Sequence, residues 1–182
     1  MTQQDLLSRL EADLRNVLAQ VRQEVVPLEE AALRHRTKPE QWNALETFAH
    51  LNVFAEMYLP RIERAIHKGK ANKWGQGHEV RYTMMGRRDV RRADPLNGKK
   101  YRTPKRYDFM DTSLELGVIK EFLILGERIL RNIQLAQQVD LNRCKVPRGK
   151  SGFFNYNLGN VFEWLVFHSQ RHISQILLIS DL

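Results

Sequence analysis

Near its carboxyl end the chain carries the run Phe162-Glu163-Trp164-Leu165-Val166-Phe167-His168-Ser169-Gln170-Arg171-His172-Ile173-Ser174-Gln175. The run predicts a helix that is buried on most of its circumference, because apolar residues occupy much of every turn. His168 and His172 are four residues apart, so they lie one turn apart on one helix face and could bind one metal ion. A third histidine, His50, lies in a second helical segment. If the two helices pack together, three imidazole nitrogens would converge on one cation and leave a coordination position open, as in catalytic rather than structural metal sites.

The histidines also admit interpretations without a metal. A buried polar group without a partner costs about 1–3 kcal/mol, and water or mutual hydrogen bonds would satisfy His168 and His172 as a metal would. Gln175, on the same face, is expected to fill space rather than to orient a ligand. His50 lies about 140° around its helix from the apolar stripe, so a surface histidine fits that position equally well. Three further histidines are expected to be solvated: His35, His67 and His78.

Hydrophobic periodicity predicts an all-α fold, a four-helix bundle formed by one domain over residues 1–182. The helices are expected over about 4–26, from Asn43 to about Lys68 with a kink at Pro60, from a cap at Thr112 to about Gln138, and from a cap at Asn160 almost to the end. No segment predicts a strand. The stretch 69–108 has no sustained period, so it is expected to be a long connection between the second and third helices.

The net charge of +8 is concentrated in that connection. Residues 68–106 hold 13 lysines and arginines against three acids, a net +10, so the other residues sum to −2. Such an insertion could attract an anionic cosubstrate. Aromatic residues are interleaved with the cations, which also suits a nucleic-acid-binding module. A solvated loop whose aromatic side chains anchor it to the bundle is favoured over that module, and the residues concerned are Trp74, Tyr82, Tyr101 and Tyr107.

Composition is that of a globular protein, with 42% hydrophobic and 27% charged residues. No secretory signal is recognisable at the amino end and no apolar run has the length of a membrane span, so a cytoplasmic protein is expected. The single cysteine, Cys144, excludes an internal disulfide and fits a reducing compartment. Its cationic neighbours Arg143 and Lys145 would lower its pKa, but a bystander thiol is expected rather than a nucleophile.

Two blocks resemble the DinB-like superfamily, also called the damage-inducible or YfiT-like family. The first runs from Trp42 through Glu46 to His50 and Leu51, and the second runs from Leu158-Gly159 through His168 and His172 to Gln175. The resemblance implies an up-down-down-up bundle, often a homodimer. It also implies a divalent ion, commonly zinc or nickel, held by a triad that matches His50, His168 and His172.

Characterised members of that family include thiol S-transferases that use bacillithiol, mycothiol or glutathione, and a thiol-dependent isomerase. The resemblance therefore implies a metal-dependent enzyme with a low-molecular-weight thiol as cosubstrate. A bundle that binds metal without catalysis remains the alternative. The chain departs from the family in its large basic insertion. It also has Ser174 where the iron-dependent sulfoxide-forming relatives carry Glu, so that chemistry is not expected.

Overall fold

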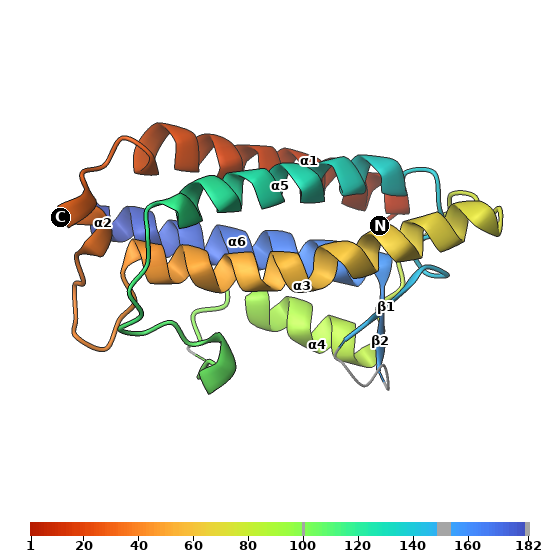
Figure 1. Ribbon diagram of the computed structural model, residues 1–182. Coiled ribbons are helices and arrows are strands. Elements are labelled where there is room, and N and C mark those ends of the chain that lie inside the picture. The colour runs from red at the N-terminus through yellow and green to blue at the C-terminus, as the bar shows by residue number, and fades with distance from the viewer. Residues whose placement is uncertain (100, 149–153, 181–182) are drawn as a thin grey trace.

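Four long helices lie side by side in the computed structural model, which describes residues 1–99, 101–148 and 154–180, with side chains to Leu178 in the last helix (Figure 1). They are α1 (Gln3–Gln20), α3 (Ala44–Ala71), α5 (Gly117–Ala136) and α6 (Leu158–Ser180). Both α1 and α3 pack on α5 and on α6. In Figure 1, α1 and α6 run toward one end of the molecule and α3 and α5 run toward the other. The fold is therefore mostly helical, as the periodicity predicts.

The apolar stripes of the sequence form the core. Every stripe residue expected to face inward in the first three long helices is buried, from Leu6 in α1 to Ala136 in α5. A π-helical turn, η1 (Val21–Val25), continues α1, and the short helix α2 (Glu30–Arg34) precedes α3. The predicted cap at Asn43 is confirmed, because Asn43 and Glu46 exchange backbone-to-side-chain hydrogen bonds of 2.9 and 3.0 Å. Pro60 lies inside α3, which continues without a break to Ala71.

Two predicted caps and the predicted absence of strands are wrong. Helix α5 begins at Gly117 rather than after Thr112, and no side chain caps it. Helix α6 begins at Leu158, because the chain enters it directly from a strand; Asn160 lies in its first turn and accepts a hydrogen bond from the Thr83 amide instead. The strands β1 (Lys145–Pro147) and β2 (Asn155–Asn157) pair antiparallel in a three-residue ladder. That ladder is too short to produce a periodic signal in the sequence.

The basic connection is folded and not a solvated loop. It contains α4 (Met84–Ala93) and the 3₁₀ turn η2 (Lys105–Tyr107), and α4 packs on α6. A Cβ at Gly86 would lie 2.3 Å from Asn160 Oδ1, so only glycine permits this close approach. The expected anchoring by aromatic residues is observed, since the Tyr82 hydroxyl donates to buried Glu163 of α6 at 2.5 Å. Lys100 of this connection lies outside the described residues.

None of the described helices combines the length and apolarity that crossing a membrane requires.

Candidate metal centre

The three predicted histidines meet between α3 and α6. One possible ligand atom from each of His50, His168 and His172 lies within 4.8 Å of those of the other two. His50 Nε2 and His168 Nε2 are 3.2 Å apart. Among the described residues, these three histidines form a group of possible ligands close enough together to hold one cation.

Of the two positions that the helical wheel allows for His50, the structure shows the flank and not the solvent-exposed surface. Its side chain is 4% exposed, because α6 on one side and the basic connection on the other cover that flank of α3. His168 and His172 are half-buried. The expected solvation of the remaining three histidines is confirmed, as all are exposed: His35, His67 and His78.

Aromatic rings from the two antiparallel helices face one another in three successive pairs, which we call the ring ladder. The pairs are His50 with His172, Phe54 with His168, and Tyr58 with Trp164, at centroid separations of 5.1, 5.3 and 5.6 Å. Each member is four residues from the next on its own helix, so the ladder follows directly from helical spacing. Trp164 also stacks on the His168 ring, with centroids 4.9 Å apart and planes inclined by 20°. This packing restricts the imidazole rotamers, so the nitrogens are held in place before any ligand arrives.

A backbone carbonyl selects the tautomer of His50. Nδ1 of His50 lies 2.8 Å from the carbonyl oxygen of Tyr107, and that contact is a hydrogen bond only if Nδ1 carries the proton. The lone pair is then on Nε2, which faces His168 Nε2. At this separation the His168 nitrogen either donates its proton to His50 or shares a cation with it. A buried N–H that donates to a carbonyl while the opposite nitrogen points into a cluster is the usual support of a metal-bound histidine.

Burial keeps the imidazoles neutral. It lowers the pKa of His168 well below its ordinary value of 6.5, and the neighbouring histidines His172 and His50 lower it further. The pKa of His172 falls to about 3, chiefly through burial and then through the charge of His50. Burial also lowers the pKa of His50, against the opposing effect of the Tyr107 carbonyl. Neutral imidazole is the form that binds a metal, so the cluster is in its ligating state at neutral pH.

Gln175 interacts with His172, and this interaction partly offsets the fall in the pKa of that ring. That Gln175 fills space rather than orienting a ligand stays a prediction. Its exposed side chain, one turn beyond His172, reaches back to the histidine because helix side chains lean toward the amino end.

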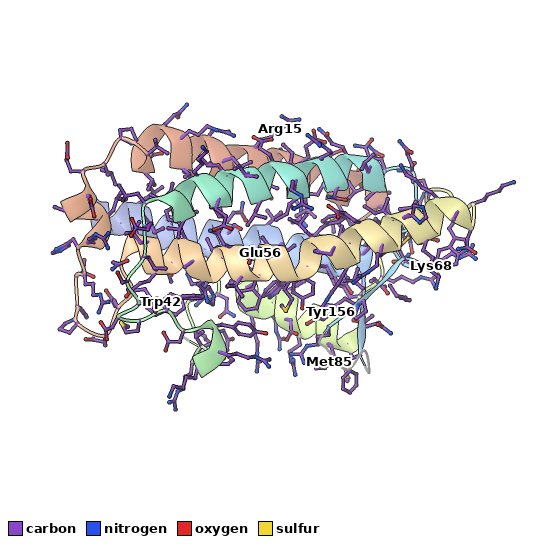
Figure 2. The ribbon with its side chains drawn as sticks, viewed as in Figure 1. Arg15, Trp42, Glu56, Lys68, Met85 and Tyr156 are labelled. Atoms are coloured by element: carbon purple, nitrogen blue, oxygen red, sulfur yellow. The ribbon has the colours of Figure 1, made fainter. Side chains whose placement is uncertain are left out.

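The end of the basic connection closes over the cluster. Trp42 lies against His50 and His172, with ring centroids 4.6 and 6.1 Å away, and its indole Nε1 donates to Asp108 Oδ1 at 2.9 Å. The amide of Asp111 donates to the capping carboxylate of Glu46 at 2.7 Å. Figure 2 shows Trp42 at the end of the bundle where α3 begins. Sequence reasoning missed these supports, since a carbonyl 57 residues from His50 leaves no pattern in the sequence.

Cys144 has no part in the site. Its side chain is 1% exposed, and burial raises its pKa to about 11. Arg143 and Lys145 lower the pKa, as expected, but the cost of removing a thiolate from water is larger. Burial and the raised pKa support the expectation of a bystander thiol.

Comparison with known proteins identifies one family. A family model described as the DinB superfamily matches residues 13–176, which include all three histidines of the cluster. No curated protein and no solved structure matches the chain significantly.

Proposed function

The chain belongs to the DinB superfamily, and from this premise we propose that it is a metal-dependent enzyme which binds a divalent ion through His50, His168 and His172. The observation that carries the proposal is the convergence of three neutral imidazoles within 4.8 Å. Nitrogen ligands suit zinc, nickel and related ions. Three protein ligands leave room for a small molecule, which is the arrangement of catalytic sites.

We propose transfer of a low-molecular-weight thiol to an electrophile as the reaction class. A divalent ion would lower the pKa of a coordinated thiol and so supply a thiolate at neutral pH. The protein's own groups would set the geometry: Tyr107 fixes the His50 tautomer, and Trp164 and Trp42 restrict the rings. The sulfur nucleophile would come from the cosubstrate, because the pKa of Cys144 is raised and its side chain is buried.

Cations beside the site support an anionic cosubstrate. Arg171 lies between the two α6 histidines in sequence and close enough that its charge lowers the pKa of both. Its guanidinium donates to the carbonyls of Arg92 and Lys99 at 2.9 and 2.5 Å, which ties the basic connection to the helix that carries the ligands. A thiol bearing carboxylates would be attracted to such a surface. As part of the same proposal, the four long helices constitute the family's up-down-down-up bundle.

The deciding experiment is metal analysis of protein purified without an affinity tag. About one divalent ion per chain is expected, and His168→Ala or His172→Ala should abolish it. His67→Ala is the matched control, because that histidine is exposed and lies on α3 about 25 Å along the helix axis from His50. Undiminished metal in both α6 variants would reject the site.

A thiol screen separates an enzyme from a bundle that only binds metal. Cobalt-substituted protein should develop a sulfur-to-metal charge-transfer band with one of bacillithiol, glutathione, mycothiol or coenzyme A, and metal-dependent turnover of a test electrophile should follow. If metal binds stoichiometrically and every thiol fails both assays, the non-catalytic alternative holds.

A further inference from the structure

The basic connection presents cations that no acid neutralises. The described part of residues 68–106 contains 12 lysines and arginines. Of these 12, only Arg88 forms an ion pair, and its partner is Asp89. In the helix α4, Arg87, Arg91 and Arg92 are exposed. Lys99 is exposed nearby, since Arg171 donates to the carbonyls of both Arg92 and Lys99. We call these four side chains the α4 cationic surface: Arg87, Arg91, Arg92 and Lys99.

The opposite face of α4 packs against the bundle. Val90 and Ala93 are 8% and 5% exposed, and Gly86 packs directly on Asn160 of α6. Figure 1 shows α4 on the side of the molecule away from α5, and α4 packs on α6. The helix therefore turns its arginines outward along about 15 Å, from ten residues at 1.5 Å each.

The chemistry of the surface favours phosphate. Every cation in α4 is an arginine, whose planar guanidinium binds phosphate through two parallel hydrogen bonds. A helix that lies on a membrane needs a free apolar face to enter the lipid, and the apolar face of α4 is packed against α6.

The aromatic side chains of the connection are engaged elsewhere. Tyr82 donates its hydroxyl to Glu163, and the Tyr101 ring has the guanidinium of Arg92 5.2 Å from its centroid and that of Arg171 5.8 Å away. Recognition of single strands relies on free rings on which bases stack. These two rings are held by other groups, whereas the cations of α4 and Lys99 are exposed, which suits contact with the regularly spaced phosphates of a double strand.

We propose that the α4 cationic surface binds the phosphate backbone of double-stranded nucleic acid, without regard to base sequence. This proposal is independent of the metal centre and of any thiol chemistry. Four phosphate contacts give a slope of log K against log salt of about −3.6, so affinity should fall about 150-fold between 50 and 200 mM salt.

The test is fluorescence anisotropy with a labelled duplex of mixed sequence, measured across that salt range. The triple variant Arg87→Ser, Arg91→Ser, Arg92→Ser should reduce the slope to about −0.9. The control triple variant Arg64→Ser, Lys120→Ser, Arg131→Ser removes the same charge from exposed positions on α3 and α5 and should keep the slope of the unaltered protein. Circular dichroism and metal content should match in all three proteins.

Three outcomes would overturn the proposal. The first is no duplex binding at 50 mM salt. The second is an equal loss in both triple variants, which would mean that net charge alone attracts the duplex. The third is tighter binding to a single strand of equal length, or to phosphatidylserine vesicles, than to the duplex.

Discussion

Acidification should lower the free energy of unfolding of the metal-free protein through the two histidines of α6. In the folded chain His172 has a pKa of about 3, and that of His168 is well below 6.5. In the unfolded chain both rings would titrate near 6.5. Between these values the unfolded state binds more protons than the folded state, so the free energy of unfolding should decrease as the pH falls from 7 to 5.

The size of the effect follows from the protons taken up. A ring with an unfolded pKa of 6.5 that stays neutral when folded contributes about 2 kcal/mol of this loss between pH 7 and pH 5. The two rings together give about 4 kcal/mol. For a domain with a free energy of unfolding in the usual range of roughly 5–15 kcal/mol, this is a large fraction of the total.

The assay is urea unfolding followed by circular dichroism at pH 5, 6, 7 and 8 with a chelator present. The double variant His168→Gln, His172→Gln cannot take up these protons, so its unfolding free energy should be about 4 kcal/mol less sensitive to this pH change than that of the unaltered protein. Each single variant should account for about half. Acidic groups titrate equally in all four proteins and cancel. A pH dependence that is the same in every protein would refute the reasoning, because it would mean that the folded rings titrate normally.

Three further outcomes are expected. Gly86→Ala should destabilise the protein by about 1–3 kcal/mol in urea unfolding, because its Cβ would collide with Asn160; an unchanged midpoint would show that α4 shifts freely. Cys144→Ser should leave metal content and any thiol-transfer rate unaltered, whereas a lost rate with retained metal would make the protein's own sulfur the nucleophile. Metal loading should slow tryptic cleavage within 102–106, because Tyr107, whose carbonyl fixes the His50 tautomer, directly follows that stretch. Equal cleavage rates with and without metal would show that metal binding does not stabilise this segment.

The core and the two α6 histidines of the cluster could be predicted because both depend on local spacing. Stripes of three and four residues fix which face of a helix is buried, and His168 and His172 share a face for the same reason. His50 required the resemblance to a family, since its position on the wheel pointed to the flank. Nothing local shows that a neighbouring segment will cover that flank.

The connection between α3 and α5 could not be predicted because its structure comes from tertiary contacts. Half of the residues of α4 are charged, and its burial rests on one glycine that allows close packing and on Tyr82, which reaches Glu163. Likewise, Thr112 and Asn160 are residue types that often cap helices. No helix begins directly after Thr112, and the Asn160 side chain accepts a hydrogen bond from the Thr83 amide instead. Local composition predicts what a residue can do, and long-range packing decides whether it does so.

The ring ladder restricts how this chain can diverge. Deleting one residue from α3 between His50 and Phe54 would rotate one part of the helix against the other by about 100°, so the rungs on the two sides of the deletion could no longer face α6 together. A substitution can change one ring pair of the ladder by itself, but insertions and deletions can be accommodated only outside the helical turns that carry the pairs. The basic connection lies in such a place, after the last rung of α3, so forty residues can be added there without altering the alignment on which the histidines depend.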